Sequence, residues 1–133
     1  MRFMLDTNAC VALIRRHDER ILGRVKRCRP EELCVSAVTL SELEYGAARS
    51  ADTPKNRLAL AEFMTPIAVV PYDDTVAVSY GRIRTELESK GMPIGPLDTM
   101  IAAHALSLGL TLVTDNEREF RRVPGLMVQN WAK

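Results

Sequence analysis

The feature that most constrains the fold is a regular alternation of short, uninterrupted apolar runs with longer segments whose apolar residues recur at helical spacing. The apolar runs predict strands at 2–5, 32–38, 66–73, 110–114 and 126–131. Helices are predicted between them at 8–17, 39–50, 55–64, 74–91 and 97–109, with a short helix or turn at 115–123. Strands without polar alternation are buried on both faces. The order therefore predicts an α/β fold of three layers, with a mainly parallel sheet flanked by helices.

The chain has 133 residues, which suits a single domain over residues 1–133 that buries a core without disulfides. Its three cysteines form no C-x-x-C pair and are interpreted as small buried thiols. We find no secretory signal and no run long enough to cross a membrane, so we expect a cytoplasmic protein without a membrane partner.

Acidic residues occupy equivalent places along the predicted sheet. Asp6 follows the first strand, Glu42 lies in the helix after the second, and Asp115 follows the strand at 110–114. Asp98 lies near the start of the helix that precedes that last strand. Because ligand sites of parallel sheets lie beyond the carboxyl ends of the strands, these four acids are predicted to share one edge.

Each of these positions also has a purely structural interpretation. Asp6 or Asn8 would cap a helix, Thr39 and Glu42 fit a capping box, and Asp98 and Asp115 are possible caps. The combination favours another interpretation, because carboxylates gathered in a cleft repel one another unless they hold protons or a cation. Oxygen ligands without nearby His or Cys suit Mg²⁺ or Mn²⁺, and such a site suits phosphoryl transfer.

The remaining polar candidates are weaker. His104 lies among apolar residues of a predicted helix and is interpreted as a structural histidine. His17 lies among charges and is interpreted as solvated. Thr7 and Ser41 are candidates to hydrogen-bond the acids.

A basic stretch is the other notable feature, since the net charge is only +1. Seven of the 18 Lys and Arg residues lie between Arg15 and Arg29. Such a surface is able to follow the phosphates of a nucleic acid. The alternative is a solvated helix face whose arginine stems lie on apolar neighbours.

Four sequence segments together resemble the motif series of PIN-domain ribonucleases, in particular the VapC-type toxins of bacterial toxin–antitoxin pairs and their enteric-type branch. The segments are MLDTN, SAVTLSELEYGA, GMPIGPLDTMIAAHAL and LVTDNEREFRRVPGL. The resemblance assigns metal binding to Asp6, Glu42 and Asp98. In the last segment it matches Thr114, Asn116 and Glu119, and either Asp115 or Glu119 supplies the charge that Asn116 lacks.

The resemblance implies a PIN-like fold and a Mg²⁺- or Mn²⁺-dependent endoribonuclease in which water activated by the metal attacks a phosphate of structured RNA. Asp6, Glu42, Asp98 and Asn116 would be catalytic, with Thr7, Ser41 and Thr114 orienting ligands. Transfer RNA is the expected substrate, above all the anticodon stem-loop of initiator tRNA, and Arg15, Arg16 and Arg20 are candidates to contact it. The implied partners are a second copy of the chain and a VapB-type antitoxin, in a higher toxin–antitoxin assembly.

Two rival functions remain open on sequence grounds. One is a PIN nuclease of rRNA or mRNA processing that has no antitoxin. The other, of a different class, is a receiver-type signalling domain with Asp73 or Asp74 as phosphoacceptor, although no lysine follows the strand at 110–114.

Overall fold

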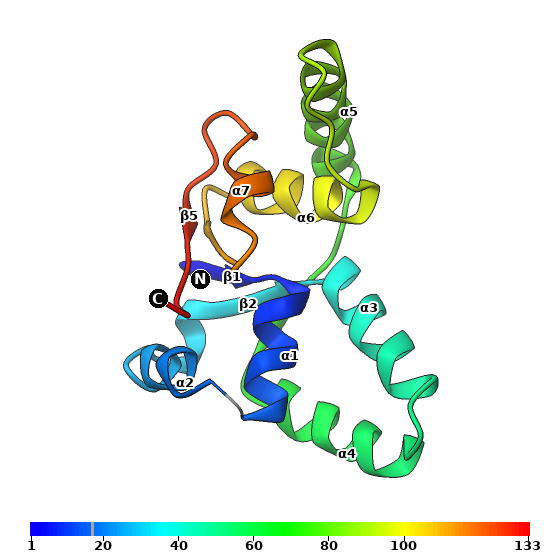
Figure 1. The fold of residues 1–133 in the computed structure, drawn as a ribbon, viewed down its shortest axis with the longest axis vertical. Coiled ribbons are helices and arrows are strands. Elements are labelled where there is room, and N and C mark those ends of the chain that lie inside the picture. The colour runs from blue at the N-terminus through cyan, green and yellow to red at the C-terminus, as the bar shows by residue number, and fades with distance from the viewer. Residues whose placement is uncertain (17) are drawn as a thin grey trace.

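Five parallel strands form one sheet in the computed structural model of the protein, which describes residues 1–16 and 18–133 (Figure 1). The strands are β1 (Phe3–Leu5), β2 (Leu33–Ser36), β3 (Ala68–Val70), β4 (Thr111–Val113) and β5 (Val128–Gln129). Their order is β3-β2-β1-β4-β5, and every pairing is parallel. The predicted sheet is confirmed, with β1 at its centre and β5 at one edge.

Helices cover both faces of this sheet. One layer contains α1 (Thr7–Arg15), α2 (Glu19–Lys26), most of α3 (Ala37–Ala48) and α4 (Thr53–Met64). The other contains α5 (Asp74–Ser89), α6 (Pro96–Ser107) and α7 (Glu117–Phe120). Figure 1 shows the sheet between α1 on one side and α6 on the other. The predicted three-layer α/β/α architecture is confirmed.

Side chains of the central strand alternate between the two layers, as the pleat of a strand requires. Phe3 and Leu5 pack on the α1 side with Trp131, whose ring meets that of Phe3 edge-on at 5.0 Å. Met4 packs on the opposite side with Ile101 of α6. Because all three β1 residues are buried, the strand has no polar face, which explains its uninterrupted apolar sequence.

The sequence prediction was wrong at several places, among them the strand at 66–73, which is limited to Ala68–Val70 and leaves Ala68 and Val69 exposed. The element order assigned no helix to α2 and no 3₁₀ turn to η1 (Pro30–Glu32), although α2 agrees with the alternative of a solvated helix face for the basic stretch. It also extended the second strand to residue 38, whereas α3 begins at Ala37. The Ser36 hydroxyl accepts a hydrogen bond from the Val38 amide at 3.1 Å and so caps α3 within the apolar run. The interpretation of His17 falls outside the described residues.

Several smaller expectations are settled by the fold. Cys10 and Cys34 are buried, Cys28 is partly buried, and all three are free thiols. No helix in the described ranges is long and apolar enough to span a membrane. The sheet order differs from that of receiver domains, in which the first strand lies next to the edge strand and the third is central.

Candidate active site

The topology brings the acidic residues to one edge of the sheet. Asp6 directly follows the central strand β1, and Asp115 follows β4, its neighbour on one side. Glu42 lies on α3, which starts where β2 ends on the other side. The helix α6 leads into β4 and runs against the strand direction, so Asp98 in its first turn lies at this same carboxyl edge.

Asp6 is almost completely buried, with 3% of its surface exposed, and it caps α1. The Ala9 amide donates a hydrogen bond of 2.8 Å to its Oδ1, so the capping interpretation of Asp6 is confirmed. The pKa of Asp6 is raised to about 6, mainly by burial and also by the charges of Asp115 and Asp98, which together outweigh the lowering effect of hydrogen bonds with Thr114 and Ala9. Capping of α1 does not explain why the negative charges of Asp98 and Asp115 act on Asp6 as well.

Asp98 is half-buried and shares this electrostatic environment. Burial raises its pKa, and the negative charges of Glu42 and Glu119 raise it further. It does not cap α6, since Gly95 occupies the N-cap position and no side chain of the described residues caps that helix. The capping alternative for Asp98 is therefore wrong, and its carboxylate is near the charges of Glu42 and Glu119 instead.

Glu42 is held by the residue next to Asp6. The Thr7 hydroxyl donates a hydrogen bond of 2.6 Å to Glu42 Oε1, which connects the start of α1 with α3. The capping-box interpretation of Thr39 and Glu42 is wrong because Ser36 caps α3. Thr7 therefore makes the expected hydrogen bond to one of the predicted acids, and its role in orienting a ligand stays a prediction.

The fourth corner of the site lies after β4. Asn116 Nδ2 donates to Glu119 Oε2 at 3.1 Å, and the Asn116 amide donates to Thr114 Oγ1 at 2.9 Å. Asp115 is exposed and does not cap α7, whose N-cap is Asn116, so that capping alternative is also wrong. Thr114 contacts both Asp6 and Asn116 and so connects the two sides of the site.

Ser41 is arranged differently from the other hydroxyl candidates. Its side chain is exposed, and its hydroxyl donates to the Ala37 carbonyl at 3.1 Å on the same helix. Ser41 thus makes no hydrogen bond to the acids in this structure, and its role in orienting ligands stays a prediction.

The five carboxylates Asp6, Glu42, Asp98, Asp115 and Glu119 fit a hard divalent cation in donor type, because they offer only oxygen. None of them forms an ion pair with a cationic side chain in residues 1–16 and 18–133. In the same ranges, no three acidic, histidine or cysteine side chains converge closely enough to hold a metal ion. A cation would therefore have to draw these mutually repelling carboxylates together.

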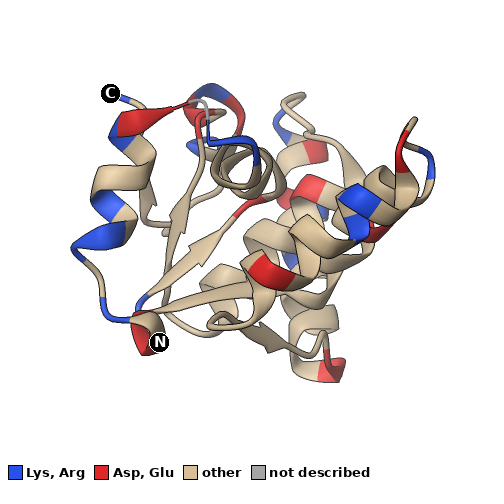
Figure 2. Cartoon of the chain, turned by 90° about the horizontal axis from the view of Figure 1, so that it is seen from below, with Lys and Arg blue, Asp and Glu red and all other residues tan. Residues whose placement is uncertain are grey.

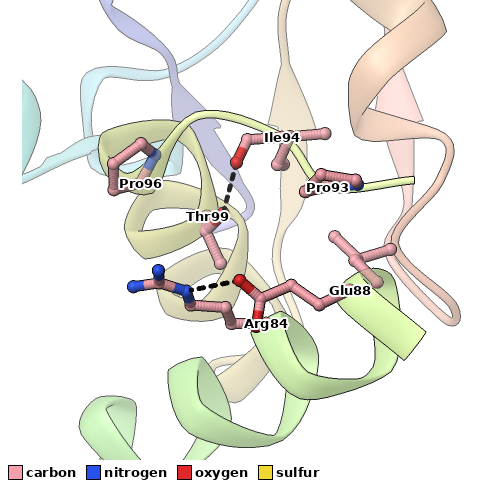
Figure 3. Close-up of a pocket in the computed structure, with 7 residues that line it drawn as sticks. Arg84, Glu88, Pro93, Ile94, Pro96 and Thr99 are labelled. Carbon is pink, nitrogen blue, oxygen red and sulfur yellow. Dashed lines mark hydrogen bonds and ion pairs between the residues drawn. The ribbon is translucent and has the colours of Figure 1, made fainter. Parts of the chain in front are cut away.

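The start of α6, which carries Asp98, is fixed by contacts around a small cavity of about 140 Å³ (Figure 3). Thr99, the next residue, donates its hydroxyl to the Gly95 carbonyl at 2.8 Å. On the α5 side of the cavity Arg84 Nε pairs with Glu88 Oε2 at 3.2 Å, and Figure 3 shows the two side chains pointing toward each other. Arg84 therefore forms its ion pair within α5, and among the described residues it forms none with Asp98.

The basic stretch divides into residues with and without structural contacts. Arg24 lies over the Trp131 ring at 5.0 Å and donates to Gln129, which confirms the packing interpretation for that side chain. Arg20 lies 3.9 Å from Asp18, while Arg15 and Arg16 are exposed at the end of α1. In Figure 2 the basic residues of α2 lie at the left edge of the molecule. Whether Arg15, Arg16 and Arg20 contact RNA stays a prediction.

The sequence and the fold match a known class of proteins. The PIN-domain family profile matches residues 3–126. A tRNA(fMet)-specific endonuclease VapC of Salmonella typhimurium (strain LT2) is 43% identical over 132 residues, which are 99% of each chain. Ribonuclease VapC2 of Rickettsia felis (strain ATCC VR-1525 / URRWXCal2) is 37% identical over 134 residues, the full length of both.

Solved structures give the same result. The chain resembles DNA-bound VapBC from Salmonella typhimurium with a TM-score of 0.94 and 43% identity, covering 98% of each chain. It resembles VapBC2 from Rickettsia felis, bound to a promoter DNA fragment, with a TM-score of 0.92 and 35% identity, covering 98% of this chain and 99% of that one. The chain therefore belongs to the PIN-domain family and, within it, to the VapC proteins. The resemblance seen in the sequence motifs is confirmed, and the receiver alternative is wrong.

Proposed function

We propose that this protein is the VapC toxin of a type II toxin–antitoxin pair and that it is a divalent-metal-dependent endoribonuclease acting on tRNA in the cytoplasm. The observation that carries the proposal is the group of carboxylates at the carboxyl edge of the sheet. Asp6 and Asp98 have raised pKa values and no cationic partner among the described residues. A cluster that a protein leaves without its own counter-charge is suited to a cation from outside.

In this proposal Asp6, Glu42 and Asp98 hold Mg²⁺ or Mn²⁺, and Asn116 with Asp115 or Glu119 completes the site. A cation held by these residues would supply activation of water for attack on the phosphate and neutralisation of the charge that builds on the phosphate oxygens. Thr7 fixes Glu42 through its 2.6 Å hydrogen bond. Thr114 contacts Asp6 and the Asn116 backbone, so it keeps the central acid in register with the β4 side.

Initiator tRNA is the favoured substrate. The full-length relatives from Salmonella typhimurium (strain LT2) and Shigella flexneri, at 43% and 42% identity, are both named for tRNA(fMet). Exposed Arg15 and Arg16 at the end of α1, with Arg20, offer positive charge for the RNA backbone. Cleavage within the anticodon stem-loop would stop translation.

A VapB-type antitoxin and a second copy of the chain are the proposed partners. The similar structures from Salmonella and Rickettsia are VapBC complexes bound to DNA. Large apolar side chains are exposed on this chain, among them Val78 at 76%, Tyr45 at 66% and Leu58 at 61%. Surfaces of this kind are typical of protein interfaces, and a homodimer within a larger toxin–antitoxin assembly would cover them.

The test is cleavage of purified RNA by the purified chain. We expect initiator tRNA to be cut once in its anticodon stem-loop with Mg²⁺ or Mn²⁺, and EDTA or Asp98→Ala to abolish cutting. Elongator tRNAs and rRNA serve as competing substrates. If rRNA or mRNA is cut and tRNA is not, the chain is a processing nuclease of the same family. If no RNA is cut with either metal, the nuclease assignment is wrong.

The antitoxin is tested with its gene. Expression of the chain alone is expected to arrest growth, and co-expression of the small open reading frame beside it is expected to restore growth. Light scattering at tens of micromolar, roughly the range in which a functional dimer persists, is expected to show a dimer of the free chain. Normal growth with soluble wild-type protein would contradict the toxin assignment.

A further inference from the structure

One buried hydrogen bond joins two elements that the active site needs but that the sequence places far apart. His104 of α6 and Ser36 at the end of β2 are both completely buried, with 0% of their surfaces exposed. His104 Nδ1 lies 2.8 Å from Ser36 Oγ, across 68 positions of sequence. Burial of an imidazole in an apolar layer costs free energy. An apolar residue at position 104 would avoid that cost, so the presence of histidine indicates that its hydrogen bond to Ser36 contributes to structure or function.

The direction of this hydrogen bond follows from the partners of Ser36. Its oxygen accepts from the Val38 amide at 3.1 Å, and among the described residues the acceptor within reach of its own proton is Nδ1 of His104. If Ser36 donates, Nδ1 of His104 is the acceptor, and the ring proton resides on Nε2, which is buried without a hydrogen-bond partner among the described residues. Burial lowers the pKa of His104, which agrees with a neutral ring, while Asp73 and the Pro71 carbonyl raise it. His104 is therefore assigned as a neutral acceptor.

Each end of this hydrogen bond belongs to a helix that carries a site acid. Ser36 caps α3, and Glu42 follows six residues later. Asp98 precedes His104 by six residues on α6. At the rise of an α-helix, six residues correspond to about 9 Å along each axis. The two helices contact each other, so the Ser36–His104 bond fixes one against the other about two turns from the acids.

We propose that His104 is a positioning residue that, by accepting the hydrogen bond from Ser36, holds α3 against α6 and so sets the spacing of Glu42 and Asp98. The inference rests on the proposed function, because it assumes that these two acids hold one cation. The Tyr72 ring meets the His104 ring edge-on at 5.7 Å and restricts its rotation. The Thr39 hydroxyl, three residues after Ser36, is buried without a partner in the described residues, so Ser36 and not Thr39 makes the hydrogen bond from α3 to His104.

Two substitutions of His104 separate positioning from simple packing. His104→Asn keeps an acceptor oxygen two bonds from Cβ, as Nδ1 is, but loses ring volume. His104→Phe keeps a buried ring of similar size and loses the acceptor. If His104 only fills space, Phe is the better replacement; if it positions α3, Asn is the better one. Ile83→Ala, which shortens a buried side chain of α5 and removes no hydrogen bond, serves as the control for loss of stability alone.

The first readout is Mn²⁺ binding by calorimetry, with no RNA present. We expect the dissociation constant to rise roughly tenfold in His104→Phe, by analogy with the loss of groups that orient metal ligands, and to change little in His104→Asn and Ile83→Ala. Hydrogen exchange of the α3 first-turn amides is the second readout, and these amides should lose protection in His104→Phe only. In RNA cleavage, kcat should fall in His104→Phe while KM stays unchanged.

The outcomes distinguish this inference from the proposed function. If wild type binds Mn²⁺ and cleaves RNA but His104→Phe behaves like Ile83→Ala, the positioning role is wrong and the function stands. If wild type binds no Mn²⁺, the proposed function is wrong and the positioning role is wrong with it. Should His104→Phe fail to fold, Ser36→Ala decides the question, since unchanged Mn²⁺ affinity in that variant also overturns the proposal.

Discussion

Two groups of acidic residues, each including a residue of α7, have opposite electrostatic environments. Glu117 accepts contacts from Lys133 at 2.8 Å, Arg121 at 2.9 Å and Asn130 at 3.2 Å, and hydrogen bonds from these three side chains lower its pKa to about 2. Asp6 is buried beside other acids, and its pKa is raised to about 6. Glu119, two residues after Glu117 in the same helix, belongs to the second group, since its charge raises the pKa of Asp98.

The difference shows which carboxylates the fold uses for its own structure. Glu117 ties α7 to the C-terminal segment and is neutralised by side chains of the chain itself. The carboxylates of the candidate site have no such partners in the described residues, although Arg121 and Arg122 follow α7 directly. Basic side chains therefore neutralise Glu117 but, among the described residues, not the carboxylates of the candidate site. This difference is expected where a metal cation is to bind.

The largest expected effect on stability comes from Asp6→Asn in metal-free protein. Asparagine keeps the oxygen that accepts from Ala9 but removes a buried charge. The pKa shift from 3.8 to about 6 corresponds to about 3 kcal/mol, so the variant should be more stable than wild type by up to about that amount near pH 7. Urea denaturation in EDTA measures the difference.

The pH dependence gives the sign of this effect. Because the folded pKa of Asp6 is raised, wild type suffers no penalty below its ordinary value of 3.8, and stability is lost as pH rises through about 6. The gain of Asp6→Asn should therefore vanish at low pH. Glu117→Gln is the matched control of opposite sign. Its lowered pKa stabilises the fold above the ordinary value of 4.5, and that contribution is lost as pH falls toward 2. A loss of stability in Asp6→Asn at every pH would contradict the comparison.

A smaller effect is expected from added metal. At about ten times its dissociation constant, Mn²⁺ should stabilise wild type by about 1.4 kcal/mol through mass action. Asp98→Ala should lose this gain, whereas Glu117→Gln should keep it in full, although both remove one carboxylate. Thermal melts with EDTA and with Mn²⁺ test both variants. An equal loss of the metal effect in the two would mean that general negative charge, and not this site, attracts the cation.

The sequence predicted most of the sheet because each strand is a short apolar run between helical segments. It failed at α2, where Ile21 is buried but basic residues dominate the pattern. It failed at the start of α3 because the apolar run continues past Ser36, and only a side-chain hydrogen bond ends the strand there. Both errors arise where one local contact outweighs hydrophobic patterning.

The candidate site was predictable in part for a similar reason. The rule that sites lie beyond the carboxyl ends of parallel strands placed Asp6 and Asp98 together, and their pKa values agree with that placement. The contact of Ser36 with His104 was not predictable, since no periodicity in the chain reports a hydrogen bond across 68 positions. Likewise, no pattern in the sequence indicates that Glu117 and Glu119 of one short helix have different partners.

The smallest expected effect extends the comparison to the arginine side chains. Arg24 is used within the fold, over Trp131, while Arg15 and Arg16 are exposed and Arg20 is held only loosely by Asp18. RNA affinity should fall with salt, and each arginine that contacts a phosphate should reduce the slope by about one when changed to Gln. Over a roughly fourfold range of salt this is about a fourfold change in affinity, or about 0.8 kcal/mol.

Arg24→Gln is the control and should lower the melting temperature but leave the slope unchanged. Filter binding of initiator tRNA to the Asp98→Ala protein, which does not consume the RNA, measures the slopes. Equal slopes for wild type and for Arg15→Gln, Arg16→Gln and Arg20→Gln would remove these residues from the RNA interface and leave the acidic site to be approached from another side.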